Sequence, residues 1–76
     1  SHIKVDKDMR VLKKARQVSM LVDEMMKERG VKTLYTWSTS PEEEQYNLFL
    51  GYAPTGYAIT IEGYEGPEIL EYNKEL

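Results

Sequence analysis

An apolar stripe with helical spacing crosses the N-terminal part of the chain and constrains its fold more than any other feature. Its members recur at intervals of three and four residues, which places them on one face of an α-helix. They are Val11, Ala15, Val18, Val22 and Met25, with Leu12, Leu21 and Met26 widening the stripe. In a chain of only 76 residues we therefore expect one helix of roughly twenty residues, about 30 Å long.

Signals at both ends define this helix. Asp6 or Asp8 can cap its start, because an aspartate side chain accepts hydrogen bonds from the unpaired N–H groups of the first turn. Gly30 follows the charged residues 27–29 and predicts the end of the helix. Before the helix, residues 3–5 alternate between apolar and polar side chains, so we expect the end of a β-strand there.

β-Branched and aromatic residues dominate residues 31–38 and predict a strand. Tyr35 and Trp37 fall on one side of this strand and Leu34 falls on the other. Apolar side chains on both sides favour a strand that is covered on both faces.

A capping box marks the start of a second, shorter helix. Ser40 occupies the N-cap position, Pro41 the first helical position and Glu43 the third. We expect this helix to run to Leu50 and to stop at Gly51. Its expected apolar contacts are Tyr46, Phe49 and Leu50.

The remaining residues predict a β-hairpin. Residues 57–61 alternate, Gly63, Gly66 and Pro67 mark the turn, and residues 69–72 form the returning strand. The predicted order is β-α-β-α-β-β, an α+β fold in which a long helix packs on a small mixed sheet. No repeat or linker interrupts it, so we expect residues 1–76 to form a single domain.

Composition excludes several classes of function. There is no cysteine, and the one histidine, His2, belongs with Ser1 to what resembles the remnant of a cleaved tag, so no metal site is expected. A formal net charge of −3 argues against binding to nucleic acid or to an anionic membrane. No apolar run approaches the roughly 20 residues of a membrane span, and we expect a soluble, cytoplasmic protein.

Three cations, Arg10, Lys13 and Lys14, lie in the first turns of the expected long helix, where the helix dipole disfavours positive charge. Two interpretations fit this cluster. It is either a solvated helix end whose charge Asp6 and Asp8 partly offset, or an anion site in which unpaired backbone N–H groups hold a phosphate-bearing ligand. Charge alone does not separate the two.

The order of the elements and several short motifs resemble the C-terminal half of the GNAT superfamily of N-acetyltransferases. The segment RVLKKA, residues 10–15, stands where that family has arginine or glutamine, any two residues, glycine, any one residue, and glycine or alanine; Arg10 and Ala15 match. KERGV, residues 27–31, is similar to the family's approach to the next strand. The segments SPEEEQYNLFLGY and EILEYNKEL resemble its following helix and its closing strand.

This resemblance implies a partial GNAT-like fold and an acyl-coenzyme A site, with acetyl-coenzyme A or coenzyme A as the cofactor. The residues that it assigns to the cofactor are Arg10, Val11, Leu12, Lys13, Lys14, Ala15 and Ser40. Lys13 replaces a glycine that lets the backbone approach the pyrophosphate, so it either obstructs coenzyme A or binds a phosphate through its ammonium group. Ser40 replaces an asparagine of the family and keeps the N-cap role.

The resemblance also bears on catalysis. The family's general acid, a tyrosine, falls on Asn47, whose amide has no proton to donate. Tyr46 is the neighbouring candidate, but one step rotates a side chain by about 100° around a helix, and we expect Tyr46 to pack in the core. The carboxylates of residues 42–44 are typical of the first turn of a helix. The family's N-terminal strands and helices have no counterpart here, so we expect no catalysis by the isolated chain.

Three functional hypotheses follow. The chain is an acyl-coenzyme A-binding domain that acts alone or as a homodimer paired through open sheet edges. Alternatively, it is a catalytically silent domain that binds a protein partner, or a part of an acetyltransferase whose N-terminal half completes the site. For the second hypothesis, the expected binding surface is a tyrosine-rich hairpin, because tyrosine is enriched in interface hot spots. Its members are Tyr52, Tyr57, Tyr64 and Tyr72.

Overall fold

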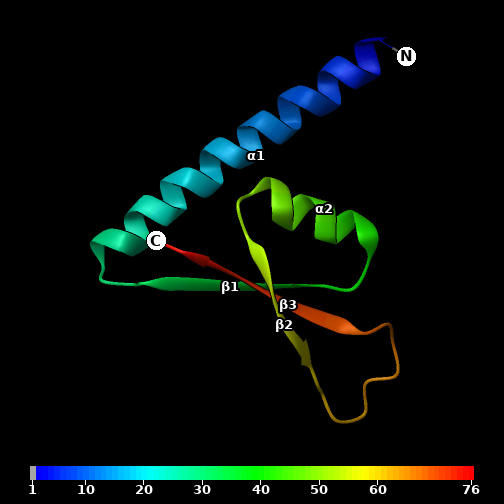
Figure 1. Ribbon diagram of the computed structural model, residues 1–76. Helices are drawn as coiled ribbons and strands as arrows, with labels where there is room; N and C mark the ends of the chain where they lie inside the picture. The colour runs from blue at the N-terminus through cyan, green and yellow to red at the C-terminus, as the bar shows by residue number, and fades with distance from the viewer. Residues whose placement is uncertain (1) are drawn as a thin grey trace.

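A computed structural model describes the backbone of residues 2–76 and the side chains from Met9 onward. This part of the chain forms two helices and three strands (Figure 1). In chain order they are α1 (His2–Glu28), β1 (Thr33–Ser38), α2 (Pro41–Phe49), β2 (Ala53–Ile59) and β3 (Ile69–Glu75). The α+β class is therefore confirmed, but the order is α-β-α-β-β and lacks the first expected strand.

The strands form one sheet with the order β1-β3-β2. β3, the last strand in the chain, lies in the centre and pairs with β1 from Thr33↔Glu75 to Ser38↔Leu70. Both pairings are antiparallel, so the expectation of a mixed sheet is wrong. The reason is the position of β3: α2 connects β1 to β2, which point the same way, and β3 lies between them.

β2 begins four residues before the strand that sequence alternation predicts at residues 57–61. Its first half contains Pro54 and Gly56, residue types that usually interrupt a strand and therefore conceal it in the sequence. The register of β2 on β3 shifts between Pro54 and Ala58. Within this irregularity Gly56 has φ +88°, a left-handed backbone conformation that favours glycine. β3 confirms the returning strand predicted at residues 69–72 and continues it to Glu75.

α1 extends further toward the N-terminus than the sequence pattern predicts. Residues 3–5 are helical, so the strand expected there is wrong. Three alternating residues carry little information, whereas an existing helix adds residues at little cost once it is nucleated. Because α1 begins at His2, Asp6 and Asp8 lie within the helix and neither occupies its N-cap, so the expected capping is wrong; their side chains lie outside the described part of the chain.

The C-terminal end of α1 is as predicted. Gly30 has φ +85°, and its N–H donates to the carbonyl of Lys27 at 3.0 Å. The N–H of Val31 donates to the carbonyl of Met26, also at 3.0 Å. These two bonds form a Schellman motif, the commonest way in which glycine ends a helix.

α2 confirms the predicted capping box and ends within one residue of the expected position. The hydroxyl oxygen of Ser40 accepts a hydrogen bond from the N–H of Glu43 at 3.2 Å. In return, the Glu43 carboxylate accepts from the N–H and from the hydroxyl of Thr39, each at 2.7 Å. Leu50 is the C-cap residue, and Gly51 follows with φ +92°.

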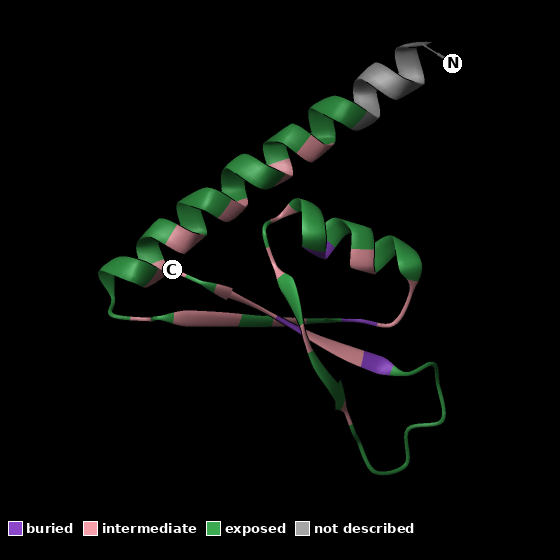
Figure 2. Cartoon of the chain, viewed as in Figure 1, coloured by how far each residue is buried: buried purple, intermediate pink, exposed green. Residues whose placement is uncertain are grey.

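The buried core is small and lies where α2 covers the sheet (Figure 2). Tyr72, which is 1% exposed, and Ile69 are its buried apolar residues, and Ser38 and Asn47 are its buried polar residues. The Ser38 hydroxyl donates to the Tyr72 hydroxyl at 3.0 Å, and the Asn47 side-chain amide donates to the carbonyl of Trp37 at 3.0 Å. Each polar side chain in this core therefore has the partner that burial requires.

One face of β1 is open to solvent. Tyr35 and Trp37 point to this face and are more than half exposed. α2 contacts β1 and covers the opposite face, which carries the buried Ser38. The expectation that this strand is covered on both faces is therefore wrong, because no described element lies over its second face.

α1 diverges from the sheet and does not pack on it along its length (Figure 1). α2 lies between the two: the Arg16 guanidinium on α1 lies 5.5 Å from the centre of the Phe49 ring, at the end of α2. Figure 2 shows most of α1 as exposed. The predicted packing of the long helix against the sheet is therefore wrong.

Candidate functional site

The residues expected to hold the pyrophosphate of coenzyme A lie inside α1 and not at its start. Arg10 and Ala15, which bound the RVLKKA segment, follow the first helical residue by eight and thirteen positions. Backbone N–H groups at these positions donate to carbonyls within the helix, because only the first four N–H groups of an α-helix are unpaired. The described chain also has no strand before α1 and no adjacent parallel strands. The amide cradle that the resemblance implies is therefore absent from the described part, and only side chains remain to bind an anion there.

The other expected cofactor residue, Ser40, does not join this segment. Ser40 lies at the N-terminal end of α2, in a hollow that Pro67 and Leu70 also line. Lys13 lies in a different hollow, between α1 and the Phe49 ring. Because these residues line separate hollows, the structure does not assemble the predicted coenzyme A site from them.

Of the two catalytic candidates, Asn47 is the buried one. Asn47 is 6% exposed and holds β1 through the carbonyl of Trp37. Tyr46 is 43% exposed and lines a surface groove with Trp37 and Glu42, so the expectation that it packs in the core is wrong. The buried side of α2 meets a strand backbone whose carbonyl needs a donor, and an amide supplies one where an aromatic ring cannot.

The tyrosine-rich surface expected on the hairpin is also incomplete. Tyr72 is the most deeply buried side chain of the core and cannot contact a partner. Tyr57 is largely exposed, and Tyr64 lies over Gly66, where an added Cβ would come within 2.4 Å of the tyrosine hydroxyl. The hairpin therefore presents two separated tyrosines and no continuous patch of four.

A series of exposed apolar side chains lies on α1 instead. Five of its apolar side chains fall within a sector of about 100° around the helix axis. They are Val11, Val18, Leu21, Val22 and Met25, and each is more than two-fifths exposed. We call this set the α1 apolar face. It contains most of the stripe that the sequence predicts to be buried. The less exposed residues of α1 lie to one side of it: Leu12, Ala15, Ser19, Asp23 and Met26.

The dimensions of the chain agree with an unpartnered surface. Its accessible surface of 6346 Å² exceeds by about 1,500 Å² the roughly 4,800 Å² expected for a compact monomer of 8.9 kDa. Its radius of gyration of 14.7 Å likewise exceeds the roughly 11.4 Å expected for 76 residues. The divergence of α1 from the sheet and the exposed residues 61–68 both contribute to this excess (Figure 1).

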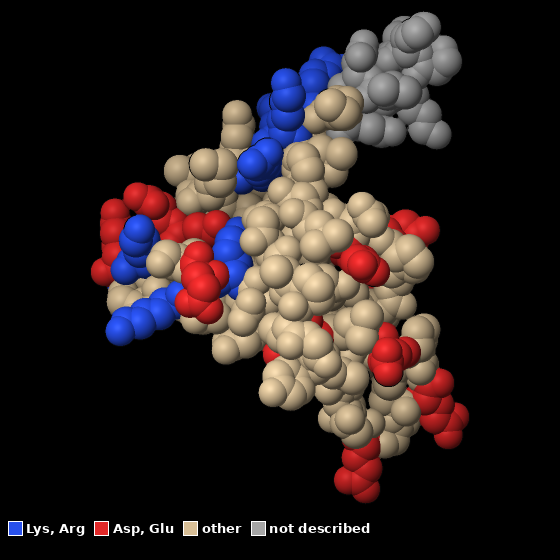
Figure 3. Space-filling view, viewed as in Figure 1, with Lys and Arg blue, Asp and Glu red and all other residues tan. Residues whose placement is uncertain are grey.

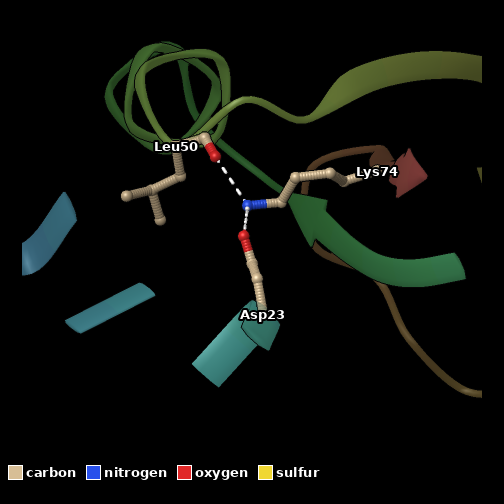
Figure 4. Close-up of polar contacts among 3 residues, drawn as sticks. All are labelled: Asp23, Leu50 and Lys74. Carbon is tan, nitrogen blue, oxygen red and sulfur yellow. Dashed lines mark hydrogen bonds and ion pairs between the residues drawn. The ribbon is translucent and has the colours of Figure 1, made fainter. Parts of the chain in front are cut away.

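A polar cluster around Lys74 joins α1 to β3 and to the end of α2 (Figure 4). The Nζ of Lys74 on β3 lies 2.6 Å from an Asp23 carboxylate oxygen on α1 and donates to the carbonyl of Leu50, at the end of α2, at 2.7 Å. The same Nζ lies 4.5 Å from the centre of the Tyr52 ring. Burial of the phenol, together with the nearby Asp23 charge, raises the pKa of Tyr52. This cluster fixes where α1 leaves the domain.

Local sequence patterns give no signal for the Lys74 cluster, because its members are separated by up to 51 residues. A weak feature of the sequence does indicate that the α1 apolar face is exposed. The stripe is as long as the whole predicted helix, and the short remainder of the chain has little apolar surface with which to cover it.

No protein-family model, curated protein or solved structure matches this chain. Across the described residues, no helix combines the length and the apolar character that crossing a membrane requires. The same residues contain no group of three or more histidine or acidic side chains placed to hold a metal ion.

Proposed function

We propose that this chain is an acetyltransferase-like α+β domain that acts as a protein-interaction module and does not catalyse on its own. One observation carries the proposal: the α1 apolar face is exposed on a helix that diverges from the sheet. Exposed apolar side chains gathered on one face mark protein-binding sites, since monomeric proteins seldom leave a large apolar patch uncovered.

The state of the expected catalytic residues supports a non-catalytic role. The side-chain amide of Asn47 donates to the carbonyl of Trp37, and the hydroxyl oxygen of Ser40 accepts from the N–H of Glu43 at the start of α2. Both side chains therefore have structural partners. The acetyltransferase-like part of the proposal rests on the resemblance of the sequence motifs.

The proposal is tested by photo-crosslinking from the α1 apolar face. In cells that produce the chain, Leu21 is replaced with p-benzoylphenylalanine, and Glu62 on the exposed hairpin loop is replaced in a matched control. We expect a discrete covalent adduct from position 21 and none from position 62. Adducts from neither position, or the same adducts from both, would contradict a binding role for this face.

A second candidate is anion binding by side chains of α1. Arg10, Lys13 and Lys14 are exposed, and the ion pair found among the described residues, Asp23–Lys74, involves none of them. Calorimetry with acetyl-coenzyme A tests this candidate, with a Lys13→Ala/Lys14→Ala variant as the control. Heat that the double substitution removes supports acyl-coenzyme A binding, whereas no heat at millimolar ligand excludes it.

A further inference from the structure

The α1 apolar face has the shape of a helix-binding seam. Val11, Val18 and Met25 recur every seven residues, with Leu21 and Val22 beside them. A seven-residue repeat keeps a narrow stripe aligned with a second helix over several turns, as in a coiled coil. The natural occupant of this face is therefore another α-helix.

Charge distribution along α1 restricts which helix fits. Near the α1 apolar face, the cations Arg10 and Lys14 lie in the N-terminal half and Glu24 and Glu28 lie toward the other end. Figure 3 shows blue side chains gathered along the described N-terminal part. Lys27, in the last turn, projects away from this face. At 100° per residue, Arg10 and Glu28 project at the same angle, and Lys14 and Glu24 flank that direction. Arg10, Glu24 and Glu28 therefore border the same edge of the α1 apolar face, and Lys14 projects just inside that edge, between Leu21 and Met25. The four charges are opposite in sign at the two ends of this face.

This arrangement is complementary to itself when one copy is reversed. Two antiparallel α1 helices that cross at Val18 place Arg10 of each copy beside Glu28 of the other, and Lys14 beside Glu24. In a parallel pair this edge of one helix faces the opposite edge of its partner, so the four charges do not meet one another and gain no such pairing. The described structure pairs none of the four charges internally.

The chain as a whole exposes enough surface for such an interface. A stable protein–protein contact buries roughly 800 Å² on each partner, about half of the excess surface estimated above. The crossing residue Val18 is exposed, so a second helix can reach it without rearrangement of the domain.

We infer that the α1 apolar face binds a second copy of this chain, with the two α1 helices antiparallel and crossing at Val18. The inference rests on the proposed function, because it names the partner of the same surface. In this register Val18 meets its own copy, whereas Val11 of one chain meets Met25 of the other.

Single cysteines test this register, and the chain offers a clean background because it contains none. We expect Val18→Cys to form a disulfide-linked dimer within minutes under mild oxidation. Met25→Cys should not link to itself, because its two copies lie about 21 Å apart along the helix axes, beyond the roughly 7 Å that a disulfide allows between Cα atoms. Mixed Val11→Cys and Met25→Cys chains should link to each other. Equal self-linking at positions 11, 18 and 25 would indicate a parallel pair and overturn the inference.

Charge reversal tests the pairing without a covalent bond. We expect Arg10→Glu/Lys14→Glu to raise the dimer dissociation constant in sedimentation equilibrium about tenfold or more. Adding Glu24→Lys/Glu28→Lys to the same chain should restore the dimer. Circular dichroism confirms that each variant remains helical, as expected for exposed positions. A wild-type chain that sediments as a monomer at hundreds of micromolar overturns the inference.

The two proposals fail differently. A monomeric purified chain whose Leu21 adduct carries the mass of another protein sustains the interaction module and removes the second copy as its partner. An absence of any Leu21 adduct removes both. An adduct of twice the chain mass, together with Val18→Cys linkage, supports both.

Discussion

At the scale of single residues, Lys74 on β3 connects the sheet to both helices. Its Nζ is shared by a carboxylate on α1 and a carbonyl at the C-terminus of α2, where a positive charge also complements the helix dipole. The side chains of Lys74 and Asp23 are 14% and 19% exposed, so water replaces neither interaction fully. Loss of the ammonium group therefore leaves two oxygens with fewer partners.

We predict that Lys74→Met lowers the free energy of unfolding by about 1–3 kcal/mol, the cost of leaving a largely buried polar group unpaired. Urea denaturation followed by circular dichroism measures this change. Lys32→Met, at an exposed position, is the matched control and should stay within about 0.5 kcal/mol of the wild type. In a double-mutant cycle with Asp23→Asn, the two effects should be non-additive. Additive effects would show that the ion pair contributes no coupling.

At the scale of elements, the start of α2 is stabilised by Glu43–Thr39 hydrogen bonds whose strength depends on pH. Hydrogen bonds from the Thr39 hydroxyl and backbone N–H lower the pKa of Glu43 below its ordinary value of 4.5, with a further contribution from Ser40. Because the folded-state pKa is lowered, the stabilisation is fully present above the unfolded-state pKa. It is lost as pH falls through the lower folded-state value.

We therefore predict that Glu43→Gln weakens the pH dependence of stability as pH falls through and below 4.5, where the unfolded carboxylate takes up its proton first. Thermal unfolding at a series of pH values gives the two slopes. Glu42→Gln, one position earlier and exposed, serves as the control. Identical slopes for Glu43→Gln and the wild type would indicate that the Thr39 contacts do not persist in solution.

The elements that sequence patterns predict correctly are those set by neighbouring residues. Ser40 and Glu43 lie three residues apart and define the start of α2, and Gly30 alone ends α1 through its left-handed backbone. The start of β2 escapes prediction because Gly56 belongs to an irregularity defined only by pairing with β3. Periodicity likewise identifies an apolar stripe on α1 but not its surroundings. Whether Val18 is covered depends on which segments lie beside it.

At the scale of the whole molecule, stability is distributed unevenly. β3 is hydrogen-bonded on both sides and carries Tyr72, the most buried residue. α1 is anchored mainly near its C-terminal end by Asp23 and extends away from that anchor. Elements with few buried contacts open locally at a lower free energy than the core. An unpartnered α1 should therefore be the least protected of the described helices and strands.

Hydrogen exchange at two protein concentrations measures both this gradient and the effect of the second copy. In dilute solution we expect the amides of residues 9–18 to exchange much faster than those of β3, since contacts with Phe49 are the tertiary contacts described for this part of α1. At concentrations above the dimer dissociation constant, exchange over residues 9–25 should slow while β3 changes little, because binding protects only the surface that it covers. The Arg10→Glu/Lys14→Glu variant should show fast α1 exchange at both concentrations. Slow exchange of wild-type α1 that does not vary with concentration would mean that α1 is already covered within a single chain, contrary to the structure.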